Sequence, residues 1–368
     1  MFKFTCPFCI REYDKSNVLY VCPDCGETAT HGTFEKEPIK CKKIGCGGLA
    51  TQRKCPLCGE EIPRVALQTP NLPFSIVGVS NSGKTNYITV MLHELGKTSG
   101  SGLRLTLSHQ NRATLDHQNE NYKRIYEDHT PPESTAGGTS MPQIWYIRNN
   151  PKKRGDTVPT YTFTIFDGAG EDHENRLDTS SPVCRYIQAS KAIIIALDPL
   201  ILSNIRKGGI VDEETMRNSL AGSKGEHKNA VDIVNSLADY IKTARGLHIS
   251  KVLTIPVAIV LTKFDTIISH KSFGPNALIK SPSLNVVDGK VSMGEIRQVH
   301  EEISNWLYEI GEGAFIDALT SNFREFYFFG VSSYGEPPKD AYTLSEHIRP
   351  HRVLDPILWL FKNAKFID

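Results

Sequence analysis

One segment, residues 74–95, constrains the fold of this chain more than any other part of the sequence. An apolar run at 74–79 is typical of a buried strand, and a helix is predicted over 86–95, before Gly96. Between them stands Gly78-Val79-Ser80-Asn81-Ser82-Gly83-Lys84-Thr85. The two glycines let the backbone wrap around a phosphate, whose charge then faces backbone amides and the N-terminus of the helix. The sequence therefore predicts a phosphate-binding loop inside an α/β domain.

The residues of this loop have separate expected roles. We expect Lys84 to reach the β and γ phosphates and the Thr85 hydroxyl to bind Mg²⁺. The other residues expected to contact the nucleotide are Ser80, Asn81, Ser82, Gly83 and Asn86.

A second motif follows the alternating strand pattern at 160–166, which ends in Asp167-Gly168-Ala169-Gly170-Glu171. A carboxylate at a strand tip, here Asp167, can hold magnesium through water. Gly170 would bring a backbone amide close to a γ-phosphate. A simple turn explains this short motif equally well when it stands alone, but behind a phosphate-binding loop it indicates the metal side of a nucleotide site.

A third motif predicts which base is bound. The apolar run at 256–261 ends in Thr262-Lys263-Phe264-Asp265, and a last strand at 326–331 precedes Ser332 and Ser333. The Asp265 carboxylate can accept hydrogen bonds from the N1 and N2 donors of guanine, which adenine lacks. Lys263 would lie over the base and brace the phosphate loop, and the serine loop would offer an amide to the guanine oxygen.

Together these motifs resemble Ras-like P-loop GTPases of the translation-factor-related class, over about residues 72–368. The resemblance implies a mostly parallel sheet, GTP and GDP as ligands with Mg²⁺, and hydrolysis of GTP. It assigns catalytic roles to Lys84, Gly170 and Glu171, together with one switch threonine. Thr139 is the choice for that threonine because it lies nearest the strand predicted at 143–148; Thr135 and Thr130 are the alternatives.

Some residues depart from the pattern of that class. Glu171 stands where many members carry a glutamine that orients water, and a carboxylate is repelled by γ-phosphate unless it is protonated or paired. This predicts slow turnover, or turnover that depends on an arginine from a partner. His173 is a second candidate to orient water, and Thr262 replaces the usual asparagine as an accepted variant.

The N-terminal segment is rich in cysteine: eight of nine cysteines lie in the first 58 residues. Pairs spaced by two residues can place two thiolates on one tetrahedral ion, and cytosolic thiols stay reduced, so zinc is favoured over disulfides. We expect two zinc ions in sites that follow sequence order, resembling two zinc ribbons over residues 1–62. The first would use Cys6, Cys9, Cys22 and Cys25, and the second Cys41, Cys46, Cys55 and Cys58, with His31 as a less favoured substitute.

The zinc ribbons have three candidate roles: passive structure, protein docking and nucleic-acid binding. Residues 1–64 hold ten basic and eight acidic side chains. Two zinc ions, each with four thiolates, would make this unit negative, which disfavours binding to a phosphate backbone. Docking of a protein partner, through the ribbons or the switch loops, is the favoured interpretation.

The amino-acid composition limits the classes of protein to which the chain can belong. The chain has 368 residues, 39% hydrophobic and 23% charged, with a net charge of +1, as expected of a globular protein without a general polyanion-binding bias. No apolar run approaches the ~20 residues of a membrane helix, and no signal peptide is apparent, so a cytoplasmic location is expected. The predicted organisation is two ribbons at 1–62, an extended linker at 63–73, and a P-loop domain at 74–368 with insertions near 97–140, 200–227 and 266–292.

The predicted function is a GTP-hydrolysing switch whose ribbons dock a partner. Two alternatives stand beside it: a guanine-nucleotide-binding adaptor with little hydrolysis, and a nucleic-acid-dependent NTPase. Zinc ribbons ahead of such a domain also resemble bacterial proteins of the double-GTPase type. A dimer paired across the nucleotide face is left open.

Overall fold

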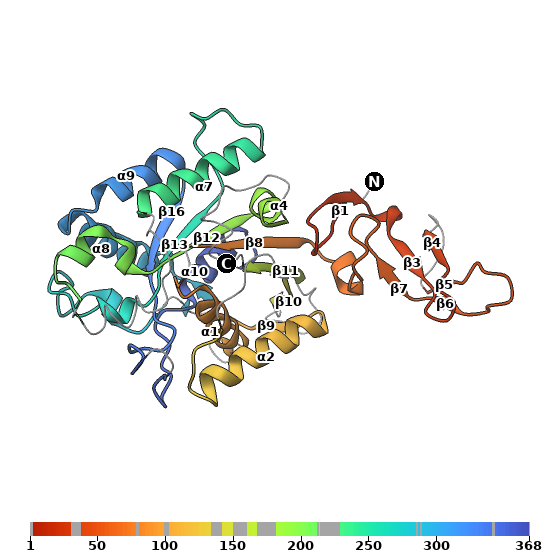
Figure 1. Cartoon of the computed structure of the whole chain (residues 1–368), viewed down its shortest axis with the longest axis horizontal. Coiled ribbons are helices and arrows are strands. Elements are labelled where there is room, and N and C mark those ends of the chain that lie inside the picture. The colour runs from red at the N-terminus through yellow and green to blue at the C-terminus, as the bar shows by residue number, and fades with distance from the viewer. Residues whose placement is uncertain are drawn as a thin grey trace.

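The computed structural model describes most of the chain and is shown in Figure 1. The described residues are 3–30, 38–78, 81–98, 103–133, 142–149, 160–167, 182–211, 213, 229–284, 286–287, 289–340 and 343–367. A ribbon region, residues 3–67, lies at one side of a larger sheet domain that begins with strand β8. No helix among the described residues is long and apolar enough to span a bilayer.

A seven-stranded sheet forms the centre of the sheet domain, in the order β16-β13-β12-β8-β11-β10-β9. All neighbouring strands from β16 to β11 pair in parallel, and β10 is antiparallel to both β11 and β9. The expected α/β class with a mostly parallel sheet is confirmed. The strands are β8 (Asn71–Val77), β9 (Leu105–His109), β10 (Gln143–Asn149), β11 (Thr160–Asp167), β12 (Ala192–Leu197), β13 (Val257–Leu261) and β16 (Phe326–Gly330).

The central strands are apolar along their whole length because both faces of the sheet are covered. Every residue of β12 and β13 is buried, as parallel strands between two helical layers require. Alternate residues of β12 enter different cores: Ile193 and Ile195 pack into one, and Ile194 into the other.

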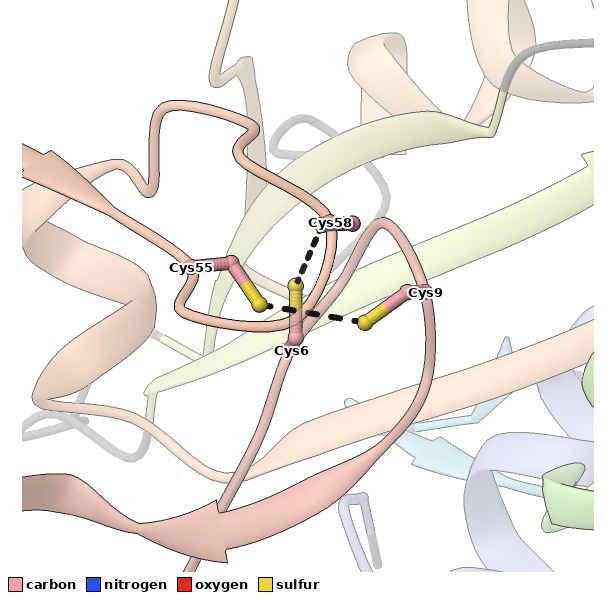
Figure 2. A group of neighbouring side chains, drawn as sticks. All are labelled: Cys6, Cys9, Cys55 and Cys58. Atoms are coloured by element: carbon pink, nitrogen blue, oxygen red, sulfur yellow. Dashed lines mark hydrogen bonds between the residues drawn. The ribbon is translucent and has the colours of Figure 1, made fainter. Parts of the chain in front are cut away.

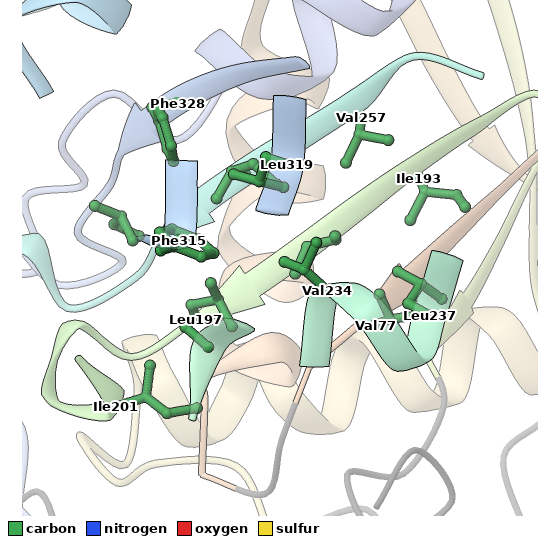
Figure 3. Close-up of a cluster of buried hydrophobic side chains, with 14 of the residues drawn as sticks. Val77, Ile193, Leu197, Ile201, Val234, Leu237, Val257, Phe315, Leu319 and Phe328 are labelled. Atoms are coloured by element: carbon green, nitrogen blue, oxygen red, sulfur yellow. The ribbon is translucent and has the colours of Figure 1, made fainter. Parts of the chain in front are cut away.

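Helices cover the two faces of the sheet. The first core, part of which is drawn in Figure 3, contains side chains from α7, α8, α9 and α4. The second core contains side chains from α1 and α10, and α2 lies against α1, β9 and β10. The helices are α1 (Lys84–Lys97), α2 (Arg112–Tyr126), α4 (Pro182–Ala189), α5 (Ser203–Lys207), α7 (Ala230–Ala244), α8 (Met293–Glu309), α9 (Gly313–Asn322) and α10 (Asp355–Asn363).

Most strands and helices expected from the sequence are present, with ends shifted by a few residues. The largest shift is in β8, which begins at Asn71 because its pairing with β11 already starts there, opposite Thr162. The expectation of an extended linker at 63–73 was therefore wrong. That stretch contains the short 3-10 helix η2 (Arg64–Leu67) and the first residues of β8.

Several elements were not expected. The region near 97–140, taken as an insertion, contains strand β9 and helix α2. The region near 266–292 contains the 3-10 helix η6 (Leu278–Lys280) and a small hairpin of β14 (Val286–Val287) and β15 (Lys290–Val291). Helices α4 and α9 also escaped prediction.

The ribbon region is built from very short strands. Strand β3 (Leu19–Val21) pairs with both β4 (Thr28–Thr30) and β7 (Gln52–Lys54). Two separate pairs complete the region: β1 (Lys3–Thr5) with β2 (Glu12–Asp14), and β5 (Ile39–Lys40) with β6 (Leu49–Ala50). The core of this region consists of small clusters of apolar side chains together with most of its cysteines. A core of this size is too small to be stable without additional cross-links.

The close approach of β8 to β12 gives a first prediction. A Cβ atom added at Gly78 would lie 2.2 Å from the Ala196 carbonyl oxygen, whereas one added at Gly96 would meet nothing within 4 Å. We expect Gly78→Ala to lower the free energy of unfolding by about 1–3 kcal/mol through overpacking. Gly96→Ala, inside helix α1, should raise it by up to about 1 kcal/mol.

Urea unfolding of the two variants beside the wild type measures this difference. Equal stability of the Gly78→Ala and Gly96→Ala variants would contradict the tight contact between β8 and β12.

Candidate functional site

The phosphate-binding loop predicted from the sequence joins the end of β8 to the start of α1. Gly83 is the N-cap of α1 and has a φ of 73°, a left-handed conformation that glycine adopts without strain. Lys84 is only 7% exposed, and its Nζ donates a hydrogen bond to the Gly78 carbonyl oxygen at 3.0 Å. This bond links the ammonium group at the start of α1 to Gly78, the first glycine of the loop.

The remaining loop residues are placed as follows. Ser82 is buried, Thr85 and Asn86 lie in the first turn of α1 and are partly exposed, and Asn81 is exposed with a φ of 61°. Ser80 lies outside the described residues.

The loop follows β8, the strand at which the order of the sheet reverses. Strand β11 lies on one side of β8 and β12 on the other, although both come later in the chain. In open parallel sheets the carboxyl ends of the strands at such a switch point form the ligand crevice. The register places Leu197, Leu261 and Gly330, the last residues of β12, β13 and β16, side by side at that same edge.

The Thr262 side chain connects the phosphate-binding loop to the end of β12 at this edge. Its Oγ1 donates to the Ser82 carbonyl oxygen at 2.7 Å and lies 3.1 Å from that of Leu197. The side chain is 2% exposed. Thr262 was expected as the first residue of the base-recognition motif; in the structure it braces the phosphate loop against the ends of β12 and β13.

The candidate base-recognition residue is Asp265. Burial raises the pKa of its carboxyl group, while a hydrogen bond from the Ser332 side chain and the charge of Lys263 act in the opposite direction. The Ser332 hydroxyl oxygen also accepts from the Gly335 amide at 2.8 Å. The structure thus brings together two of the expected base-recognition residues, Asp265 and Ser332, and Ser333, the next residue, is partly exposed.

Lys263 forms an ion pair that was not expected from the sequence. Its Nζ forms a 2.6 Å ion pair with Asp198, whose other oxygen caps the 3-10 helix η4 (Pro199–Ile201) by accepting from the Leu200 amide. Asp198 was not recognised in the sequence as a site residue. The signal was its position, because it directly follows the buried strand β12 at the carboxyl edge.

Tyr334 is the second residue that sequence reasoning missed. Its side chain is 9% exposed, and its hydroxyl has no hydrogen-bond partner among the described residues. Burial, and then the charge of Asp265, raise the pKa of this phenol. An aromatic residue directly after Ser332 and Ser333 was the available signal.

Part of the predicted catalytic set cannot be placed. Thr139, Gly170 and Glu171 lie outside the described residues, as do Thr135 and His173. Asp167 ends β11 opposite Ile76, which puts its backbone one residue short of the level where β8 ends. Thr130 is described, and its amide donates to the Arg124 carbonyl oxygen just after α2.

A metal site could form where the knuckle that follows β1 meets the one that follows β7. This proximal cluster consists of Cys6, Cys9, Cys55 and Cys58 (Figure 2). The Sγ atoms of Cys6 and Cys58 lie 3.9 Å apart, and those of Cys9 and Cys55 lie 3.8 Å apart. A hydrogen bond with Cys6 lowers the pKa of the Cys9 thiol to about 5.

The distal cluster consists of the other four cysteines, Cys22, Cys25, Cys41 and Cys46. Its sulfur contacts are 3.8 Å between Cys22 and Cys46, and 3.5 Å between Cys25 and Cys41. Zn–S bonds of about 2.3 Å in a tetrahedron place sulfur atoms about 3.8 Å apart. Both clusters therefore fit a tetrahedral zinc ion.

The expectation that the sites follow sequence order was wrong, and the pairing of β3 with β7 explains why. The strands are antiparallel, with Leu19 opposite Lys54 and Val21 opposite Gln52. Cys22 and Cys55, each directly after one of these strands, therefore project from opposite ends of the pair. One cluster forms at each end. The distal cluster is nested in the sequence, because all four of its cysteines lie between Cys9 and Cys55 of the proximal cluster.

Comparison with known proteins gives only distant structural likeness. No protein-family model matches the chain, and no curated protein matches it. Among solved structures, the S. cerevisiae Ski7 GTPase-like domain bound to GDP and inorganic phosphate is 15% identical, with a TM-score of 0.34 over 81% of this chain and 50% of that one.

Two further structures show the same level of likeness. The bacterial selenocysteine-specific elongation factor EF-Sec is 11% identical, with a TM-score of 0.29 over 82% of this chain and 30% of that one. The signal recognition particle receptor SRb-GTP/SRX complex from Chaetomium thermophilum is 13% identical, with a TM-score of 0.28 over 73% of this chain and 94% of that one. The chain spans half the length of the Ski7 domain and less of EF-Sec. Likeness this distant does not carry a function to this chain.

Double cysteine variants distinguish nested from sequential metal sites. In the nested arrangement Cys9→Ser with Cys55→Ser damages one site only, so about one tightly bound zinc per chain should remain of about two in the wild type. Cys9→Ser with Cys22→Ser takes one thiolate from each site and should weaken both. Zinc content after dialysis against a chelator measures this, and the reverse pattern would support sites in sequence order.

Proposed function

We propose that this chain binds guanine nucleotides with Mg²⁺ and hydrolyses GTP to GDP, acting as a nucleotide-dependent switch. One observation carries the proposal. A partly buried carboxylate, Asp265, lies at the same edge of the sheet as the phosphate-binding loop, and Thr262, three residues before it, donates a 2.7 Å hydrogen bond to the Ser82 carbonyl oxygen of that loop. A single nucleotide would span the two features.

The phosphate end of the site is supported by charge and by backbone geometry. Lys84 and the N-terminus of α1 favour negative charge at the loop. Mg²⁺ would be held by the Thr85 hydroxyl, with Asp167 acting through water, and would neutralise charge on the β and γ phosphates when bound.

The base end of the site is supported by the surroundings of Asp265. Burial penalises the charged form of this carboxylate, and the N1 and N2 donors of guanine would relieve that penalty. Adenine offers no matching pair of donors, so a desolvated carboxylate rejects it. The 2.6 Å pair of Lys263 with Asp198 fixes the lysine stem beside this position.

Hydrolysis is proposed to be slow unless a partner stimulates it. Glu171 stands where the resembled class carries a glutamine, and its charge opposes γ-phosphate. Glu171→Gln should therefore raise turnover. Guanine-nucleotide binding without measurable turnover in either form would favour the adaptor function instead.

The distal end of the ribbon region is proposed to dock a protein partner. In the knuckle between Cys41 and Cys46, Ile44 is fully exposed, and the nearby Leu49 is 42% exposed. Strands β5 and β6, on either side of this knuckle, lie at the end of the molecule away from the sheet domain (Figure 1). An exposed apolar residue on a metal-stabilised turn is suited to a small apolar cleft on another protein.

The choice of base is tested by Asp265→Ala. Loss of two charge-assisted hydrogen bonds should weaken GDP binding by about 100-fold or more, with little effect on ADP binding. Asp239→Ala, an exposed carboxylate on α7, is the matched control. Titration of labelled GDP and ADP with Mg²⁺, together with GTP and ATP turnover, measures the effect. Preference of the wild type for adenine nucleotides would contradict the assignment of Asp265.

A further inference from the structure

The proximal metal cluster is connected to the sheet domain through its first knuckle, residues 6–10. Ile10, directly after Cys9, is 7% exposed and belongs to the first core of the sheet domain, which also contains Phe166 and Tyr186. Its φ of 55° turns the chain sharply at this point. The knuckle is therefore packed into the sheet domain by an apolar anchor.

Tyr186 of α4 forms the polar part of this contact. Its side chain is 2% exposed, and its hydroxyl donates to the backbone of the knuckle, to the Phe8 carbonyl oxygen and, at 3.2 Å, to that of Pro7. These carbonyls belong to the two residues between the ligands Cys6 and Cys9. The tyrosine thus fixes the turn that sets the spacing of two metal ligands.

The ring of Tyr186 continues the contact toward β11. It stacks on Phe166 with ring centroids 4.3 Å apart and an interplanar angle of 11°. Phe166 directly precedes Asp167, the residue proposed to hold Mg²⁺ through water. A shift of the knuckle would therefore move the aromatic neighbour of a magnesium-binding residue.

A second connection leads from Tyr186 to β8. The Ser190 hydroxyl donates to the Tyr186 carbonyl oxygen at 2.7 Å, and the Ser75 hydroxyl lies 2.7 Å from that of Ser190. Both serines are buried, at 3% and 0% exposure. Ser75 lies three residues before Gly78, the first glycine of the phosphate-binding loop.

The proximal cluster also borders β10. Pro142, which directly precedes β10, lines the same cleft as Cys9, Cys58 and Arg185. Strands β10 and β11 pair at Gln143 and Ile165, near the end of β11 that leads to Asp167. The distal cluster, by contrast, lies at the other end of the β3–β7 pair.

We propose that Tyr186 is a positioning residue that couples metal binding at the proximal cluster to guanine-nucleotide binding, and that the distal cluster lacks this coupling. The inference rests on the proposed function. Coupling between two sites is reciprocal. Nucleotide should therefore slow zinc release from the proximal cluster, and loss of proximal zinc should weaken nucleotide binding.

The first experiment uses wild-type, zinc-loaded chain and a colorimetric zinc chelator, with and without saturating GDP and Mg²⁺. One of the two release phases should slow by about fivefold or more with GDP, and the other should not respond. Tyr186→Phe keeps the aromatic stack but removes the hydroxyl, so the slowing should be largely lost. Tyr240→Phe, a buried tyrosine of α7 in the same core, is the matched control and should keep it.

The second experiment compares Cys9→Ser with Cys25→Ser, the second cysteines of two matched Cys-Pro-x-Cys knuckles. The Kd for fluorescent GDP should rise about fivefold more in Cys9→Ser than in Cys25→Ser. Equal effects of the two variants, or release phases that both ignore GDP, would overturn the coupling while leaving the proposed function intact. A wild-type chain that binds no guanine nucleotide would overturn both.

Discussion

The hydrogen bonds of the Thr262 hydroxyl hold the candidate site together. One side chain contacts the backbone of the phosphate-binding loop at Ser82 and that of β12 at Leu197, from a position just after β13. Two residues later, the Phe264 amide donates to the Val331 carbonyl oxygen at 3.0 Å, which brings in the loop after β16. The positions of Lys84, Asp265 and Ser332 relative to one another depend on these contacts. This buried hydroxyl is costly to remove because the Ser82 carbonyl oxygen would lose its donor, whereas the Leu197 carbonyl oxygen would keep the Thr262 amide at 2.9 Å.

The ribbon region obeys a different constraint. Its strands are two to three residues long, too short to be stable by pairing alone, so metal at the two clusters would supply much of its folding free energy. The antiparallel β3–β7 pair separates the clusters and gives them different surroundings. One faces the sheet domain through Ile10 and Tyr186, and the other carries the exposed Ile44. The small region therefore contacts the sheet domain at one end and exposes an apolar side chain at the other.

Sequence reasoning succeeded where the signal was local. The run Ala-Ile-Ile-Ile-Ala-Leu of β12 indicates a strand buried on both faces. The two glycines of the phosphate-binding loop are required by the backbone there, because Gly83 has a positive φ and Gly78 lies close to the Ala196 carbonyl oxygen. Prediction from the sequence failed where the outcome depends on pairing between segments that are far apart in the chain. The grouping of cysteines depends on the register of β3 against β7, which spacing does not reveal. Helix α2 was missed because its buried face is partly polar: Gln118, for example, donates to the Thr89 carbonyl oxygen at 3.0 Å, so no apolar period marks it. Asp198 likewise becomes a site residue only through its tertiary partner, Lys263.

Native mass spectrometry of the intact purified chain is the most direct test that one molecule combines a guanine-nucleotide site with two metal sites. The proposed function predicts the mass of the 368-residue chain plus two zinc ions and one guanosine nucleotide. Collisional release should identify that nucleotide as GDP or GTP. A chain that carries an adenosine nucleotide, or fewer than two zinc ions when purified without chelator, would contradict it.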